Sequence, residues 1–170
     1  AVVQEYMDKV NEKVGTNYKL FNYYGAEDAE HVIIAMGSAC ETIEETIDYL
    51  MAAGRKVGLV TVRLYRPFCA QALIDAIPDS VKQISVLDRT KEPGAQGEPL
   101  YLDVVAALKG SKFDQVPVFS GRYGLGSKDT TPAQIVAVYD NTEKAKFTIG
   151  IVDDVTNLSL EVGAPLVTTP

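Results

Sequence analysis

The sequence predicts an α/β fold in which a mostly parallel sheet carries helices on both faces. Short apolar runs alternate along the chain with longer segments of helical periodicity. Because a helix that joins two parallel strands crosses over in the right-handed sense, this alternation builds a sheet covered on both sides. With 170 residues, 46% of them hydrophobic, the chain is long enough to bury one sizeable core.

The first segments predict a helix followed by a strand. Val3, Met7, Val10 and Val14 recur at helical spacing over residues 2–14, and Gly15 is placed to end that helix. The aromatic-rich run "YKLFNYYG", residues 18–25, is typical of a strand.

The next pair is a buried strand and an amphipathic helix. The continuous apolar run "HVIIAMG", residues 31–37, is typical of a strand that is buried on both faces. In the helix expected over residues 38–54, Ser38 and Glu41 have the spacing of a capping box, and Gly54 is placed to end it. Its expected apolar stripe consists of Ile43, Ile47, Leu50 and Met51.

The same pattern continues to residue 152. We expect strands over residues 56–62, 83–88, 116–121 and 146–152, and helices over residues 66–77, 98–110 and 131–141. Pro67 and Pro132 are expected in the first turns of two of these helices. The α/β core begins near residue 16, and we expect one domain over residues 1–152. The remainder, residues 153–170, lacks helical periodicity and is expected to be a connector towards the next domain.

Composition and charge disfavour several classes of protein. The net charge of −7, without a run of Lys and Arg, argues against a nucleic-acid binder. The apolar runs are far shorter than a membrane span, and no signal peptide is visible. The first residue, Ala1, and the final "LVTTP" indicate a piece cut from a longer chain.

The few cysteine and histidine residues limit the chemistry. Cys40 and Cys69 are far apart and have no metal-ligand spacing, so we expect packed thiols in a reducing compartment. The single histidine, His31, opens an apolar run, which argues against a catalytic triad or a histidine-based metal site.

Several loops follow the predicted strands, where α/β proteins bind ligands. Gly37 and Ser38 lie at a helix start that could attract an anion, although capping already accounts for Ser38. Arg63 and Arg66 could clamp a carboxylate or phosphate, or face solvent or another domain.

The glycines at 121, 124 and 126 reverse the order of the dinucleotide fingerprint, so tight turning is the favoured interpretation. A free-standing module that binds a nucleotide or another small molecule through residues 121–126 remains an alternative.

The most unusual loop is "DRTKEPGAQGEPLY", residues 88–101. We expect its charges to contact neighbouring domains, and with Arg122 the candidates are Asp88, Arg89, Lys91 and Glu92. Pro93 and Pro99 would stiffen the loop and reduce the entropy lost on docking. The alternatives are a merely solvated loop and acid–base chemistry by its carboxylates, for which no nucleophile, histidine or metal set is at hand.

Five long segments resemble pyruvate:ferredoxin (flavodoxin) oxidoreductases. They are "YYGAEDAEHVIIAMGSACETIEE", "VGLVTVRLYRPF", "DRTKEPGAQGEPLYLDV", "GRYGLGSKDTTPAQIVAVYDN" and "FTIGIVDDVTNLSL", which span nearly the whole chain in order.

The resemblance implies the second domain of such an enzyme, similar to the C-terminal domain of transketolases. That fold is a three-layer α/β/α sandwich with one antiparallel strand, for which residues 18–25 are the candidate. The equivalent dimerising domain of a transketolase or a 2-oxoacid dehydrogenase remains an alternative.

The resemblance also implies the activity of a cytoplasmic parent enzyme, or one in an anaerobic organelle. Such enzymes oxidatively decarboxylate pyruvate to acetyl-CoA and CO₂ and reduce ferredoxin or flavodoxin, and they are homodimers in anaerobic metabolism. Their cofactors are thiamine diphosphate, magnesium and 4Fe–4S iron–sulfur clusters, and coenzyme A is a substrate. The chain has neither a G-D-G motif nor a C-x-x-C-x-x-C set. We therefore assign no catalytic, cofactor-binding or metal residue here and expect a structural domain that is inactive alone.

Overall fold

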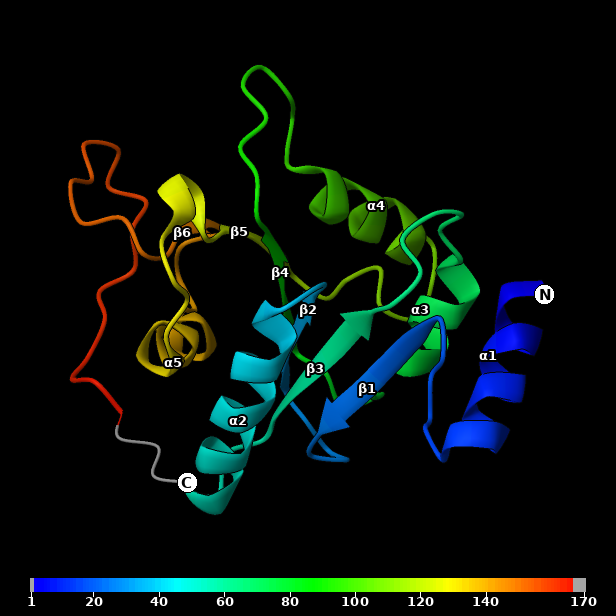
Figure 1. Cartoon of the computed structure of the whole chain (residues 1–170). Helices are drawn as coiled ribbons and strands as arrows, with labels where there is room; N and C mark the ends of the chain where they lie inside the picture. The colour runs from blue at the N-terminus through cyan, green and yellow to red at the C-terminus, as the bar shows by residue number, and fades with distance from the viewer. Residues whose placement is uncertain (1, 167–170) are drawn as a thin grey trace.

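The computed structural model describes residues 2–166, which form a six-stranded mixed sheet between two layers of helices (Figure 1). The strand order is β1-β3-β2-β4-β5-β6, and only the β1–β3 pair is antiparallel. The elements follow one another as α1 (Val2–Val14), β1 (Phe21–Gly25), β2 (His31–Ala35), α2 (Ala39–Ala52), β3 (Val57–Val62), α3 (Ala70–Ala76), β4 (Gln83–Asp88), α4 (Pro99–Leu108), β5 (Val118–Arg122), η1 (Leu125–Ser127), α5 (Pro132–Asp140) and β6 (Lys146–Thr148).

The predicted three-layer sandwich with one antiparallel strand is confirmed. Side chains of β2 alternate between the two faces, as they must in an extended strand. Ile33 packs with the apolar side chains of α2 and α5, whereas Val32 and Ile34 pack with those of α3 and α4. The sheet therefore has two apolar cores, one beneath each helical layer.

Three local expectations for the helices are wrong. Ser38 precedes α2 with helical φ and ψ, and its side chain makes no capping hydrogen bond, so the Ser38–Glu41 capping box does not form. Met51 is 40% exposed and does not join the buried stripe of α2. Pro67 lies outside α3, which begins only at Ala70.

The predicted start of α5 is confirmed, and Thr131 and Gln134 form a capping box there. Pro132 occupies the first turn of the helix. The Thr131 hydroxyl accepts a hydrogen bond from the Gln134 amide at 3.3 Å, and the Gln134 side chain accepts one from the Thr131 amide at 3.2 Å. This reciprocal pair is a true capping box.

The segment after β6 runs alongside the sheet rather than forming a helix. Thr148 donates its amide to the Leu158 carbonyl at 2.9 Å and accepts from the Leu160 amide at 3.0 Å. Leu160 packs against the core beneath α2 and α5. Part of the segment predicted as a connector is thus attached to the domain, while its residues 167–170 lie outside the described residues.

Candidate functional site

The charged loop singled out in the sequence leaves the sheet at the carboxyl end of β4. Residues 89–98 connect β4 to α4 and rise well above the rest of the fold (Figure 1). The strand ends at Asp88, whose register partner on the parallel strand β5 is Arg122. The carboxyl ends of neighbouring parallel strands therefore bring these two candidates to one edge of the sheet.

Asp88 fixes the base of the loop to α4. Its carboxylate is buried and accepts hydrogen bonds from the amide of Leu100 at 2.9 Å and of Tyr101 at 3.1 Å. These amides belong to the first turn of α4 and have no partner within the helix. Burial raises the pKa of Asp88, and the two amide hydrogen bonds oppose that rise. Asp88 therefore caps a helix that begins eleven residues later in the sequence.

Glu98 fixes the other end of the loop. Its side chain is buried, and one carboxylate oxygen lies 2.5 Å from Nε of Arg122. The second oxygen lies 3.4 Å from the hydroxyl of Ser120. Because a buried carboxylate is costly without a partner, this pair holds Glu98 and Arg122 in place.

The part of the loop between these anchors is exposed. Lys91, Glu92 and the following residues up to Gln96 all face solvent. A turn at the tip is closed by a hydrogen bond from the Ala95 amide to the Glu92 carbonyl at 3.2 Å. Glu92 also accepts a hydrogen bond from the Thr90 hydroxyl at 3.3 Å. The loop thus has firmly held ends and an exposed charged tip.

Arg89 lies between the base and the tip. Arg89 directly follows β4 and is exposed. Its side chain lies beside Gly124 in the glycine-rich loop after β5, which we call the glycine loop. A side chain at Gly124 would approach Nε of Arg89 to 2.8 Å. Of the five candidates, Asp88 and Arg122 are engaged within the domain, whereas Arg89, Lys91 and Glu92 are presented at the surface.

The glycine loop uses its glycines for backbone geometry, as the sequence favoured. Gly124 and Gly126 have φ near +64°, in the left-handed region that glycine adopts without strain. At Gly121 a side chain would collide with Phe147 and Leu87 of the core.

The two arginines after β3 are engaged within the described domain. Arg63 donates from Nε to the Asn22 side chain at 2.7 Å and lies over the Tyr18 ring. Arg66 pairs with Asp103 of α4 at 2.8 Å. A ligand clamp would have to compete with both of these contacts.

The single histidine is a core residue. His31 is buried, with Nδ1 3.1 Å from the Tyr139 carbonyl and Nε2 2.9 Å from the Ser85 hydroxyl. Burial lowers the pKa of His31 to about 4. The imidazole is therefore neutral at physiological pH and links β2 with β4 and α5.

The cysteines lie apart. Cys40 packs in the core beneath α2, and Cys69 packs against the core on the opposite face of the sheet. Within residues 2–166 we find no cluster of three or more His, Cys, Asp or Glu side chains that could hold a metal ion. The same part of the chain has no helix long and apolar enough to cross a bilayer.

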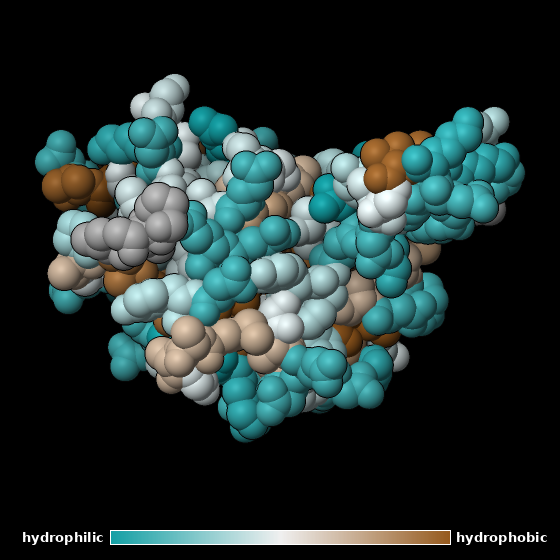
Figure 2. Space-filling model, turned by 60° about the horizontal axis from the view of Figure 1, so that its bottom comes forward, coloured by the Kyte–Doolittle hydropathy of each residue, from teal (hydrophilic) through white to brown (hydrophobic). Residues whose placement is uncertain are grey.

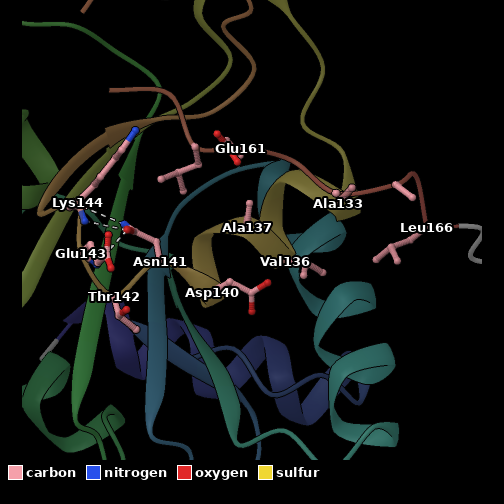
Figure 3. A pocket seen from close by; sticks show the side chains of 13 residues that line it. Ala133, Val136, Ala137, Asp140, Asn141, Thr142, Glu143, Lys144, Glu161 and Leu166 are labelled. Carbon is pink, nitrogen blue, oxygen red and sulfur yellow. Dashed lines mark hydrogen bonds between the residues drawn. The ribbon is translucent and has the colours of Figure 1, made fainter. Parts of the chain in front are cut away.

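A hollow of about 680 Å³ lies between α5 and the segment after β6 (Figure 3). The segment after β6, which we call the tail, crosses above α5, with Glu161 over Ala137 in this view. On the loop after α5, the side chain of Asn141 bonds to the backbone of Lys144, donating to its carbonyl and accepting from its amide, each at 2.9 Å. The Asn141 amide is thus satisfied by the backbone of its own loop, and the hollow is the groove beneath the tail.

Comparisons with known proteins place these features in a family. A family model described as pyruvate:ferredoxin oxidoreductase core domain II matches residues 29–135. The chain is 52% identical over 173 residues to a pyruvate:ferredoxin oxidoreductase of Moorella thermoacetica, covering 99% of this chain and 15% of that protein. It is 50% identical over 186 residues to a pyruvate-flavodoxin oxidoreductase of Nostoc sp., covering 100% of this chain and 16% of that protein. The chain thus spans about a sixth of the length of these relatives.

A solved structure shares the fold. The 2-oxoglutarate:ferredoxin oxidoreductase of Magnetococcus marinus, solved with 2-oxoglutarate, coenzyme A and succinyl-CoA bound, aligns with a TM-score of 0.51 at 22% identity. The alignment covers 82% of this chain and 22% of that one.

Proposed function

We propose that this chain, which belongs to the pyruvate:ferredoxin oxidoreductase core domain II family, is a structural and docking domain of a larger 2-oxoacid oxidoreductase. The observation that carries the proposal is the identity of about half of all positions to two such enzymes over essentially the whole chain. The parent would oxidatively decarboxylate pyruvate to acetyl-CoA and CO₂ and pass the electrons to ferredoxin or flavodoxin. It would do so in the cytoplasm, as a homodimer.

In this proposal the chemistry lies in other parts of the parent. The residues of this chain do not fit thiamine diphosphate with magnesium, because the sequence contains no G-D-G motif. They do not fit an iron–sulfur cluster either, since a 4Fe–4S cluster takes four thiolates. The chain has two cysteines, which pack on opposite faces of the sheet.

Residues 89–98 would provide one docking contact. Arg89, Lys91 and Glu92 are exposed, and both ends of the loop are held by buried carboxylates. A loop that is ordered before it binds loses less conformational entropy on docking. Asp88 and Arg122 would contribute by holding the loop in its docking position.

We further propose that residues 1–152 form the domain and residues 153–170 connect it to the next one. The hydrogen bonds of Thr148 to Leu158 and Leu160 support a connector whose first half is attached beside β6. Residue 1 and residues 167–170 lie outside the described part of the chain.

The proposal is tested by assaying the 170-residue chain and the full-length parent side by side. The readouts are pyruvate- and coenzyme A-dependent reduction of a viologen dye and calorimetric titration with thiamine diphosphate. We expect the parent to turn over and the isolated chain to show neither turnover nor binding. Activity or tight thiamine diphosphate binding by the isolated chain, or a parent that does not oxidise pyruvate, would refute the proposal.

A further inference from the structure

Helix α1 presents its apolar side to solvent. None of its 13 residues is buried, although apolar side chains recur along it at intervals of three and four. Positions spaced in this way share one side of a helix. The exposed fractions are 39% for Val3, 61% for Tyr6, 44% for Val10 and 69% for Val14. We call these four side chains the α1 stripe.

Polar side chains, not the stripe, attach α1 to the domain. Gln4 accepts a hydrogen bond from the Leu20 amide at 3.2 Å. Asn11, two turns further along, accepts from the Tyr18 amide at 2.6 Å and donates to the Tyr18 carbonyl at 2.8 Å. The space between α1 and the strand β1 is a hollow of about 590 Å³, lined on the helix by Gln4, Asp8 and Asn11. The side of α1 that carries Gln4 and Asn11 therefore faces the domain. Met7 lies between them on that side and is half-buried, so it is not part of the α1 stripe.

The position of α1 in the fold agrees with these contacts. The helix stands beyond β1, outside the two helical layers that cover the sheet (Figure 1). Neither apolar core includes a residue of α1. In the view of Figure 2 most of the surface is hydrophilic, and the hydrophobic surface forms small separate patches, some near the lateral ends of the molecule.

Such an arrangement is costly for a helix on its own. Helices of this length are marginal in water, and most helical stability in proteins comes from packing an apolar face. Burying apolar side chains stabilises a fold, and the α1 stripe forgoes this stabilisation while it faces solvent. An exposed contiguous apolar patch commonly marks an interaction site.

We propose that the α1 stripe docks into an apolar groove of another domain of the same parent polypeptide. This is the helix-in-groove mode, in which anchors at i, i+3, i+7 and i+11 enter a groove. The inference rests on the proposed function, in that the chain is taken as one domain of a longer polypeptide. The groove would have an apolar floor for the valines and a polar acceptor near its rim for the Tyr6 hydroxyl.

Two observations favour an intrachain domain over a second copy of the chain. The Moorella relative is several times longer, since this chain covers 15% of it. The stripe is also small, because four side chains on one 13-residue helix fall short of the roughly 800 Å² per partner that a stable interface between separate proteins buries. A tethered domain needs less area because the linkage gives it a high effective concentration.

The flanks of the stripe give no preference for a partner of one charge. Glu5 and Lys9 pair with each other at 2.7 Å, and Gln4 donates to Asp8 at 2.8 Å. Helix α1 thus carries both signs of charge, partly neutralised within the helix. We therefore expect apolar complementarity, not charge, to define the groove.

Backbone hydrogen exchange of α1 in the full-length parent tests the proposal. We expect residues 2–14 to exchange at least tenfold more slowly in the parent than in the 170-residue chain, because docking protects the helix. Equally fast exchange in both would overturn it. Concentration-dependent self-association of the 170-residue chain that slows exchange of α1 would also overturn it, in favour of a second copy.

A matched pair of variants locates the effect on the stripe. Val10→Gln removes one anchor without adding a charge, and Glu12→Gln changes an exposed residue two positions away, off the stripe. Because Val10 is 44% exposed, both variants should leave the circular dichroism of the isolated chain unchanged. In the parent, Val10→Gln should speed exchange and proteolytic nicking near α1 at least threefold, and Glu12→Gln should not.

Two outcomes with these variants would overturn the proposal. They are equal effects of the two variants, and dissociation of the parent into smaller assemblies by Val10→Gln. These readouts do not depend on turnover. A protected α1 in a parent that does not oxidise pyruvate would refute the proposed function alone, and an unprotected α1 in an active parent would refute this inference alone.

Discussion

Asp88 shows how one side chain can organise a loop and a helix together. It ends β4, is 6% exposed, and accepts hydrogen bonds from two amides in the first turn of α4. Burying an amide without a hydrogen-bond partner destabilises the fold by the full free energy of desolvating that amide. The carboxylate of Asp88 is therefore a structural group, and its position determines where the charged loop begins.

We expect Asp88→Ala to lower the free energy of unfolding by about 1–3 kcal/mol, because it leaves the Leu100 and Tyr101 amides unpaired. Urea unfolding of the 170-residue chain measures this change. Asp153→Ala, at an exposed carboxylate, serves as the control and should alter stability by less than about 0.5 kcal/mol. Equal stabilities of the two variants would show that Asp88 does not hold α4.

His31 makes a second prediction, for the dependence of stability on pH. Its folded-state pKa of about 4 lies below the ordinary 6.5, mainly because burial disfavours the charged ring. As the pH falls, the unfolded chain binds the proton first, so the stability that neutral His31 contributes is complete above pH 6.5 and lost between about 6.5 and 4. The loss is on the order of 3 kcal/mol.

The measurement is urea unfolding of the wild type and of His31→Gln between pH 7.5 and 4. Among the charged groups near His31, Arg55 lowers its pKa further and Asp140 opposes that effect. All other titrating groups are the same in the two proteins, so their contributions to the pH dependence cancel. Only the wild type carries His31, and its free energy of unfolding should therefore fall more than that of the variant on acidification. Parallel pH profiles would contradict the assigned pKa.

At the scale of elements, the two helix starts at Ser38 and Thr131 form a natural comparison. Thr131→Ala should destabilise the chain by about 1 kcal/mol, because it removes a capping hydrogen bond at the start of α5. Ser38→Ala should change stability by less than about 0.5 kcal/mol, because the Ser38 side chain makes no capping bond. Urea midpoints measure both, and the reverse order would show that the caps are wrongly assigned.

The regular elements could be predicted from sequence because their signals are local. The apolar run of β4 predicted its bounds of residues 83–88, and Pro132 marked the start of α5. Ser38 had the right spacing for a cap, but its backbone is already helical, and spacing alone does not report φ and ψ. The spacing of α1 predicted the helix, but not which side would face the domain.

The contacts that build the loop could not be predicted in the same way. Asp88 was a candidate because of its charge, but its role depends on α4 returning beside the end of β4. Glu98 was only one charge among several in the sequence, and its partner Arg122 lies 24 residues away on the next strand. Such pairs form through the topology of the sheet, and a single sequence carries no local signal for them.

At the scale of the molecule, exposed features lie at three borders of the sheet. Helix α1 stands beyond β1, the charged loop rises from the carboxyl ends of the strands, and the tail runs beside β6 (Figure 1). Near this last border, Val152 is 86% exposed and Val155 is 98% exposed. This distribution is what we expect of a domain that meets neighbours on several sides.

The proposed docking role of residues 89–98 predicts that Arg89→Ala acts differently in the isolated chain and in the full-length parent. Arg89 is exposed, so the 170-residue chain should lose less than about 0.5 kcal/mol of stability. In the full-length parent, removing one partner of a docked charge pair should cost about 2–5 kcal/mol at the contact. Turnover or resistance to limited proteolysis should therefore fall.

Lys82→Ala is the control, at an exposed cation just before the amino end of the same strand, and it should have little effect in either context. The decisive measurement is the urea midpoint of the 170-residue chain beside turnover and limited proteolysis of the parent. We expect Arg89→Ala to have a small effect in the isolated chain and a large one in the parent. Equal and negligible effects in both would contradict it and leave residues 89–98 as a solvated loop.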